Sequence, residues 1–156
     1  MSEAAVIDLA DAEATAALGA AVASAMSHGV VHLCGTLGVG KTTLARGLLR
    51  ARGVTGAIRS PTYTLLEPYR TAQGPVLHMD LYRLRDPLEI EQLGLGDYPP
   101  AQTLWLVEWP ERGGGLIPDA DLLIELEAAG PGRRARLGGA LARLVHLRTK
   151  VVSSRA

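Results

Sequence analysis

The residues best suited to chemistry form one glycine-rich stretch, Gly35-Thr36-Leu37-Gly38-Val39-Gly40-Lys41-Thr42. It matches the pattern G-x-x-x-x-G-K-[ST], in which backbone N–H groups surround the phosphates of a nucleotide. In such a loop the lysine, here Lys41, reaches the β- and γ-phosphates, and the hydroxyl of Thr42 binds Mg²⁺. The stretch therefore predicts a site for a nucleoside triphosphate and Mg²⁺.

The flanking sequence has the elements that such a loop needs. An apolar run at 30–34 predicts a strand before the loop, with Gly29 as its turn residue. After the loop, leucines at 44, 48 and 49 have helical spacing, and Gly53 suits the end of a helix. A helix N-terminus offers free N–H groups and a favourable dipole to phosphate. This context argues against the alternative, a glycine-rich turn that binds nothing.

Composition indicates a globular, non-membrane protein. The chain has 156 residues, of which 47% are apolar and 21% charged. It lacks a run of about 18 apolar residues that could span a bilayer. Its acidic N-terminus does not resemble a signal peptide, and Cys34 as the single cysteine excludes an internal disulfide. We therefore expect a cytoplasmic protein that does not associate with membranes.

The charges are unevenly distributed although 16 basic and 16 acidic residues balance overall. Residues 133–156 contain seven Arg or Lys and no Asp or Glu. Such segregation can mark a surface for phosphate or an acidic partner, or simply a solvated basic face. The sequence leaves both possibilities open.

Strand and helix patterns alternate along the chain. We expect strands at 5–9, 62–69, 76–82, 103–107 and 122–126 in addition to the one before the loop, with a hairpin turn at 70–75. Helices are expected after Asp11, after the loop, after Asp86, and over a final segment containing Leu137, Leu141, Leu144 and Val145. The prediction is a three-layer α/β fold of the P-loop NTPase type, with a mainly parallel sheet and an antiparallel hairpin insertion. One domain should span residues 1–148, followed by a flexible tail at 149–156.

Two carboxylates follow predicted core strands. Asp80 ends the run 76–80, and Glu108 ends the run 104–108. The carboxyl ends of strands in an open α/β sheet face the crevice where ligands bind. Either residue fits the acidic position that completes a Mg²⁺ shell beside a P-loop hydroxyl. Each is equally compatible with a solvated strand end.

Two further segments carry weaker signals. Ser60-Pro61-Thr62-Tyr63-Thr64 is rich in hydroxyl groups, so Thr62 and its neighbours could reach a γ-phosphate or its water as switch segments do. In isolation this is a common sequence between a turn and a strand. Trp109 follows Glu108 directly and could pack on a nucleotide or a partner, or merely cover the edge of the core.

Taken together, these motifs resemble the TsaE family. The resemblance runs from about Val6 to Arg136 and rests on four segments, which are Leu37-Gly38-Val39-Gly40-Lys41-Thr42-Thr43, Ser60-Pro61-Thr62-Tyr63-Thr64, His78-Met79-Asp80-Leu81-Tyr82-Arg83-Leu84 and Val107-Glu108-Trp109-Pro110. It implies a cytoplasmic ATPase required for threonylcarbamoylation of the adenosine 3′ of the anticodon in tRNAs reading codons that begin with A. The implied partners are a threonylcarbamoyl-transferase subunit and its paralogue, proteins of the TsaD and TsaB type, and tRNA indirectly through that complex.

The resemblance also implies site residues. Thr42 and Glu108 would be the Mg²⁺ ligands, and Lys41, Asp80, Glu108 and Thr62 would serve hydrolysis. Residues implied to contact ATP are Gly35, Leu37, Gly38, Val39, Gly40, Lys41, Thr42, Thr43, Asp80, Trp109 and Arg133, the last from a segment similar to the family's G-R-x-A-R. Thr36 departs from the aspartate common in the family, so any role of that charge does not transfer to this chain.

Two other functions remain open at this stage. A small-molecule kinase could use Arg133, Arg134 and Arg136 as a lid, although no insertion is large enough for an obvious acceptor pocket. Alternatively, ATP could merely order a docking surface. The partner that accelerates ADP formation would distinguish these alternatives.

Overall fold

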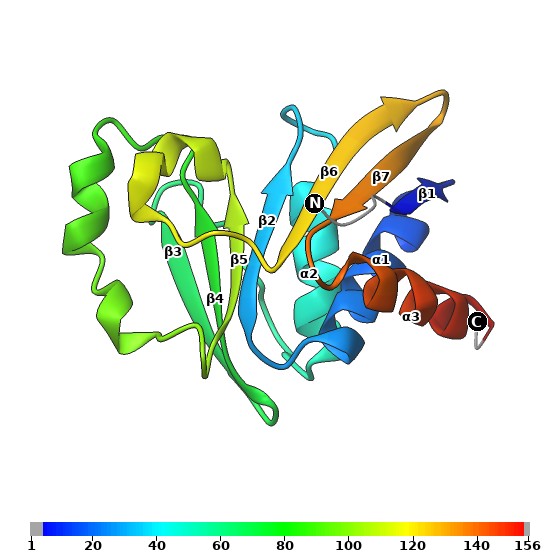
Figure 1. Cartoon of the computed structure of the whole chain (residues 1–156), viewed down its shortest axis with the longest axis horizontal. Helices are drawn as coiled ribbons and strands as arrows, with labels where there is room; N and C mark the ends of the chain where they lie inside the picture. Colours follow the sequence, from blue (N-terminus) through cyan, green and yellow to red (C-terminus); the bar gives the residue numbers. More distant parts are fainter. Residues whose placement is uncertain (1–4, 155–156) are drawn as a thin grey trace.

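The computed structural model describes residues 5–154, which form a seven-stranded sheet with helices (Figure 1). The strands are β1 (Ala5–Leu9), β2 (Gly29–Cys34), β3 (Leu66–Thr71), β4 (Gly74–Asp80), β5 (Leu104–Glu108), β6 (Leu122–Ala129) and β7 (Gly132–Gly138). The α-helices are α1 (Ala12–Ala25), α2 (Lys41–Ala51) and α3 (Ala142–Ser154). Three 3₁₀ segments, η1 (Pro87–Gln92), η2 (Leu95–Asp97) and η3 (Pro110–Leu116), complete the described chain.

The sheet has the order β1-β7-β6-β2-β5-β4-β3. Its centre is parallel, because β2 pairs with both β5 and β6 and β4 pairs with β5 in that sense. Antiparallel pairs lie toward the edges, namely β3 with β4, β6 with β7, and β1 with β7. The predicted α/β class, with a mainly parallel core and an antiparallel hairpin, is confirmed.

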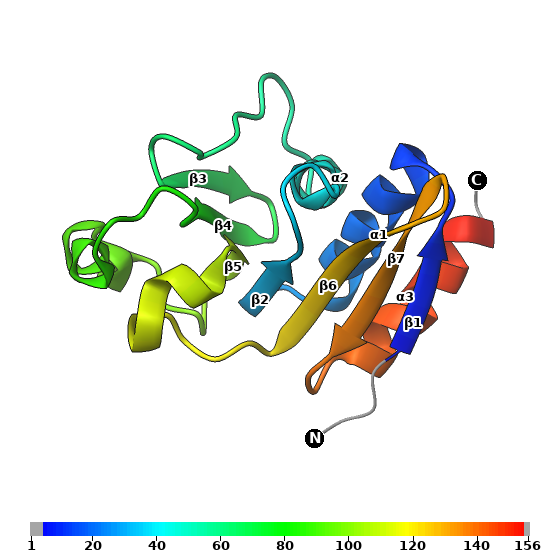
Figure 2. The same ribbon diagram turned by 90° about the horizontal axis from the view of Figure 1, so that it is seen from above.

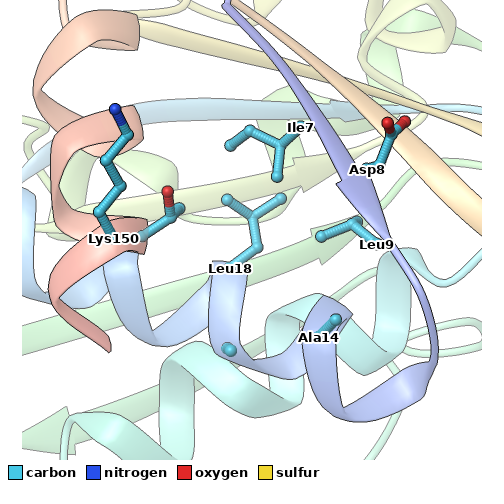
Figure 3. Close-up of a pocket in the computed structure, with 8 residues that line it drawn as sticks. Ile7, Asp8, Leu9, Ala14, Leu18 and Lys150 are labelled. Atoms are coloured by element: carbon cyan, nitrogen blue, oxygen red, sulfur yellow. The ribbon is translucent and has the colours of Figure 1, made fainter. Parts of the chain in front are cut away.

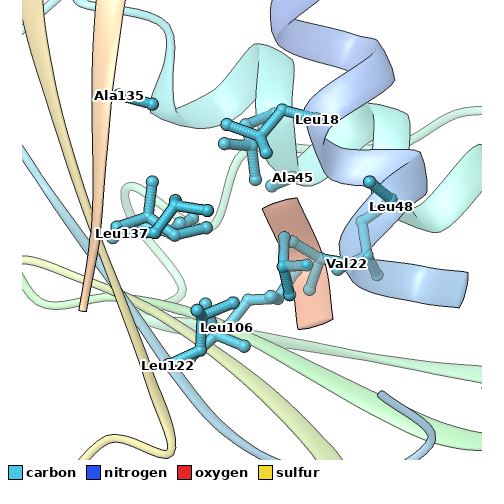
Figure 4. Packing of buried hydrophobic residues seen from close by; sticks show 14 of the residues in the cluster. Leu18, Val22, Ala45, Leu48, Leu106, Leu122, Ala135 and Leu137 are labelled. Carbon is cyan, nitrogen blue, oxygen red and sulfur yellow. The ribbon is translucent and has the colours of Figure 1, made fainter. Parts of the chain in front are cut away.

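The α-helices cover one face of the sheet, with α1 between α2 and α3 (Figure 2). Glycines bring α1 and α2 together, since a Cβ at Gly47 would lie 2.2 Å from the carbonyl oxygen of Ala16. Buried side chains from these helices meet those of the central strands (Figure 4). They include Leu18 and Val22 of α1, Leu48 of α2, and Leu106 of β5.

The opposite face is covered by 3₁₀ segments and loops instead of α-helices. A second cluster of buried side chains lies there, including Leu77, Met79, Trp105 and Ile90. The start of η1 follows the sequence prediction, because Asp86 forms a capping box with Glu89. The segment nevertheless adopts 3₁₀ rather than α-helical geometry. Within residues 5–154, no helix is long and apolar enough to cross a membrane.

The predicted hairpin is confirmed, but its limits differ. β3 begins at Leu66 rather than at residue 62, because the N–H of Leu65 donates to the carbonyl of Pro61 in a turn. Leu65 itself has a left-handed φ of 68°. β4 extends back to Gly74, leaving only residues 72 and 73 as the loop.

One strand was not predicted from the sequence. Leu137, which the sequence analysis assigned to the last helix, lies in β7 and pairs with Ile124 and Ala5. Three arginines interrupt the alternating pattern of this strand and conceal it, although Ala135 and Leu137 are fully buried. Helix α3 starts only at Ala142 and continues to Ser154, so it includes most of the segment expected to be a tail.

Candidate active site

The glycine-rich loop connects β2 to α2 at the carboxyl end of the parallel strands (Figure 1). Gly40 caps α2 with a φ of 114°, a conformation that favours glycine. Gly35 has a φ of 145°, and a Cβ there would lie 2.6 Å from the carbonyl oxygen of Leu126. These two glycines let the loop turn tightly against β6 and present the N-terminus of α2 to the cleft.

Lys41 is the first residue of α2, and its side chain is buried at the loop. Its Nζ donates to the carbonyl of Gly35 and lies 3.8 Å from the centroid of the Trp109 ring. Burial lowers the pKa of this ammonium, while the nearby carboxylates of Glu108 and Asp80 oppose that shift. The lysine is therefore a buried cation close to negative groups.

Asp80 and Glu108 end two neighbouring parallel strands and lie directly opposite each other in the register of β4 and β5. Because side chains alternate along a strand, Glu108 shares its face with Leu104 and Leu106, which pack toward the helices. Both carboxylates are nearly inaccessible, with 6% exposure for Asp80 and 2% for Glu108. Two carboxylates buried side by side disfavour each other's charged forms, and the nearby ammonium of Lys41 partly offsets this repulsion.

The electrostatics of Asp80 reflect this crowding. Burial raises the pKa of its carboxyl group, and the charge of Glu108 raises it further. The N–H of Tyr82, 3.0 Å from Oδ1, and the charge of Lys41 act in the opposite direction. Asp80 is thus held in a position where a further cation would favour its ionised form.

The switch-like segment at 60–64 reaches this carboxylate. Thr62 Oγ1 donates to Asp80 Oδ2 at 3.4 Å and lies 2.8 Å from the hydroxyl of Ser60. Tyr63 next to it is 80% exposed and packs against the guanidinium of Arg83, 4.5 Å from the ring centroid. The structure therefore brings Thr62 to Asp80 while leaving the tip of the segment in solvent.

Trp109, which follows the end of β5, packs its indole ring against the ammonium of Lys41. Its backbone is left-handed, with φ 56° and ψ 49°, which turns the chain sharply after Glu108. The indole ring lies 4.9 Å from the ring of Tyr82, and the guanidinium of Arg112 lies over both rings. Sequence reasoning missed Tyr82 and Arg112. The available signal for Tyr82 was its position two residues after Asp80, whereas nothing in its spacing links Arg112 to the loop.

His78 is the other residue that sequence reasoning missed. Its Nε2 lies 2.7 Å from Oε2 of Glu108, and both side chains are buried. Its position two residues before Asp80 in a predicted strand was the available signal, because period-2 alternation places both on one face.

A cleft of about 240 Å³ collects most of the predicted site residues. It is lined by Leu37, Gly38, Gly40, Lys41, Thr42, Thr43, Ser60, Thr62, Asp80, Tyr82, Glu108 and Trp109. A smaller hollow of about 180 Å³ shares Gly38, Gly40 and Thr43 and contains Val39 and Arg133. Arg133 Nε donates to the carbonyl of Val39 at 3.0 Å, so this arginine supports the loop from the side away from the carboxylates.

The hydroxyl of Thr42 and the carboxylates of Asp80 and Glu108 offer only oxygen atoms, as Mg²⁺ prefers. In the described part of the chain, no group of three or more His, Cys, Asp or Glu side chains could hold a metal ion. The opposed carboxylates therefore fit Mg²⁺.

Covalent catalysis by Cys34 does not fit this site. Burial raises the pKa of its thiol to about 11, and the charges of Glu111 and Glu125 add to the shift. At neutral pH the thiol stays protonated and is a poor nucleophile. Cys34 is therefore not a nucleophile for this cleft.

Another hollow, of about 490 Å³, lies between β1, α1 and α3 (Figure 3). Ile7, Leu9 and Leu18 form its apolar wall, and Asp8 and Lys150 contribute the charged groups. None of the predicted site residues lines it. Although this hollow is larger than the cleft at the glycine-rich loop, it contains none of the residues predicted to act on a nucleotide.

The fold and the loop define a P-loop α/β protein. The family model described as "Threonylcarbamoyl adenosine biosynthesis protein TsaE" matches residues 9–136, and the chain belongs to this family. The resemblance seen in the sequence motifs is thereby confirmed.

Two relatives named "tRNA threonylcarbamoyladenosine biosynthesis protein TsaE" illustrate the similarity. The protein from Haemophilus influenzae is 48% identical over 63% of this chain, and that from Bacillus subtilis 39% identical over 67%. These alignments span 62% and 65% of the relatives' own lengths. The crystal structure of YdiB from Bacillus subtilis is similar with a TM-score of 0.74 and 26% identity, covering 99% of this chain and 97% of that one.

Proposed function

We propose that the chain binds ATP and Mg²⁺ in the cleft at the glycine-rich loop and hydrolyses ATP slowly when alone. The observation that carries this proposal is the convergence of Lys41, Asp80 and Glu108 beside the N-terminus of α2. A helix N-terminus and a lysine favour bound phosphate, whereas carboxylates repel it unless they hold a metal ion or orient water. The combination is that of a site for metal-assisted phosphoryl transfer.

Each side chain has a separate role in this proposal. Lys41 leaves the carbonyl of Gly35 and binds the β- and γ-phosphates. Thr42 and Glu108 are the side chains that would hold Mg²⁺, which when bound neutralises charge on the phosphates. Asp80, linked to Thr62, orients the attacking water and connects it to the segment at 60–64.

The biological role proposed for this activity follows the names of its relatives. ATP hydrolysis by this chain would be required for threonylcarbamoylation of the adenosine 3′ of the anticodon in tRNAs reading codons that begin with A. The proposed partners are a threonylcarbamoyl-transferase subunit and its paralogue, of the TsaD and TsaB type, with tRNA engaged through them. These partners would place the protein in the cytoplasm.

The state of the arginines supports gating by these partners. Within residues 5–154, no arginine lines the main cleft, because Arg133 bonds the back of the loop and Arg112 stacks on Tyr82 and Trp109. Phosphoryl-transfer sites that lack such a cation are slower by about 10³–10⁵. We therefore expect docking to supply or reposition this cation and to order the segment at 60–64.

The kinase alternative loses its structural basis. Arg134 forms an ion pair with Asp8, and Arg136 forms one with Glu127, both on the surface of the sheet. Arg133 faces the loop backbone. These three arginines therefore do not form a lid over the cleft.

Steady-state ADP release tests the proposal. The wild type should release ADP slowly alone and faster with the transferase complex and tRNA, whereas Lys41→Ala should be inactive in both conditions. Thr62→Ala should retain slow turnover but respond less to the complex. An isolated enzyme that turns over fast and ignores the complex would contradict gating, and stimulation by a metabolite would favour a kinase.

A further inference from the structure

His78 and Glu108 form a buried polar pair between β4 and β5. The side chains of His78 and Glu108 are 1% and 3% exposed, and Nε2 of His78 lies 2.7 Å from Oε2 of Glu108. His78 lies opposite Leu106 in the strand register, so Glu108 is its diagonal neighbour two residues further along β5. On the same face, Asp80 follows His78 along β4 and Glu67 of β3 lies opposite His78 in the register, while the neighbouring Val76, Leu104 and Leu106 are apolar and pack under the helices.

The hydrogen bonding of His78 identifies its tautomer. Nδ1 is buried and has no hydrogen-bond partner. Among the described residues, the other buried side-chain nitrogen and oxygen atoms all have one. A proton on Nδ1 would leave a buried N–H donor unpaired, whereas a lone pair there is less costly. The proton is therefore assigned to Nε2, which donates to the carboxylate of Glu108.

The two carboxylates of the cleft are thus held by different means. Asp80 accepts from a backbone N–H and from Thr62 in the half-exposed segment at 60–64. Glu108 accepts from an imidazole that is locked inside the sheet. The first carboxylate is therefore bonded in part to a segment that reaches solvent, whereas the second is bonded within the sheet.

We propose that His78 is a positioning residue for Glu108. It fixes one carboxylate oxygen, Oε2, and so orients the other toward the cleft to receive the cation that accompanies the nucleotide. The proposal rests on the metal-binding role proposed above for Glu108. Hydrogen bonds of this kind to metal-binding side chains are commonly worth about 10- to 100-fold in metal affinity.

Cation binding measured without turnover tests this role. Mn²⁺ binding to the protein with saturating ADP can be followed by the electron paramagnetic resonance signal of free Mn²⁺. His78→Leu should weaken Mn²⁺ binding by about tenfold or more, because it removes the donor. His78→Gln should restore most of the affinity, since its amide nitrogen lies where Nε2 does in histidine.

Two controls separate positioning from a general structural role. ADP binding in the presence of a chelator should be the same in all variants, since it does not use Glu108. His78→Asn is the matched control for His78→Gln, because its shorter amide replaces Nδ1 and does not reach Glu108. If the leucine variant does not fold, the comparison of Gln with Asn still decides.

The outcomes distinguish the two proposals. A wild type that binds no Mn²⁺ with ADP would contradict the proposed metal site itself. A wild type that binds Mn²⁺, with His78→Leu or His78→Asn binding it equally well, would contradict only the role of His78. Loss of ADP binding in chelator would also overturn positioning, because the defect would then lie in the loop.

Discussion

Charged side chains are buried near one edge of the sheet and solvated near the other. At the cleft beside β4 and β5, Asp80, Glu108 and Lys41 are buried. The pKa of Asp80 is raised and that of Lys41 is lowered, so both shifts disfavour the charged form. Toward the β1 end, the pair Arg134–Asp8 between β7 and β1 and the pair Arg136–Glu127 between β7 and β6 lie largely in solvent. Buried charge costs free energy unless something compensates it, whereas solvated ion pairs contribute little. The comparison teaches that the cleft retains charge at the expense of stability, as expected of a functional site.

The largest effect should come from the buried cation. Lys41→Ala should lower ATP turnover by at least about 10²–10³-fold, because electrostatic stabilisation of the transition state is lost. Turnover by purified protein, with and without the transferase complex, measures this. Wild-type turnover in the variant would remove the glycine-rich loop from the mechanism.

The two carboxylates should differ in a Mg²⁺ titration of turnover. Glu108→Ala should raise the Mg²⁺ concentration needed for half-maximal rate, because a metal ligand is lost, and should also slow turnover. Asp80→Ala should slow turnover about 10²–10⁴-fold with a smaller change in the Mg²⁺ requirement, as expected for a group that acts on water. If both variants behave alike, the roles assigned to the two carboxylates are wrong.

Removing charge at Asp80 should stabilise the free protein. Because the folded-state pKa of Asp80 is raised, its contribution to stability is present below the unfolded pKa and is lost as pH rises through the folded value. Asp80→Asn should therefore raise the free energy of unfolding at pH 7, and the difference from wild type should shrink toward pH 3. Urea denaturation at several pH values measures this, and a variant less stable at pH 7 would contradict it.

Removal of residues 149–156 should affect the β1 end only. Thr149 and Lys150 line the hollow between β1, α1 and α3 and lie outside the cleft. Because these residues do not contact the cleft, ATP affinity should remain within about twofold of wild type, which corresponds to roughly 0.4 kcal/mol. Binding of a fluorescent ATP analogue tests this, and a large loss of affinity would show that the two ends are coupled.

The smallest effect should come from a solvated ion pair. Arg136 Nε lies 3.3 Å from Oε1 of Glu127, and both side chains are about half exposed. Arg136→Ala should change the free energy of unfolding by about 0–1 kcal/mol and leave turnover unchanged. A loss as large as that of a buried residue would erase the contrast between the two ends of the sheet.

The loop, both carboxylates and most elements could be predicted from the sequence, because their signals are local. The glycine spacing identifies the loop, and apolar runs ending in Asp80 and Glu108 identify two core strands, which the structure shows to be parallel neighbours. What could not be predicted depends on contacts between distant segments. β7 shows no clear alternation because Arg134 and Arg136 find partners on β1 and β6, and His78 acquires its role only from the register of β4 against β5.

The sharp turn at Trp109 has an optical consequence. The chain has two tryptophans, and Trp105 is buried in β5 with its indole N–H donating to the carbonyl of Tyr98. Trp109 instead lines the cleft with an ammonium 3.8 Å from its ring centroid. Any ligand that draws Lys41 away changes the field at only one of the two fluorophores. In a Trp105→Phe background, the remaining emission would report occupancy of the cleft without a label.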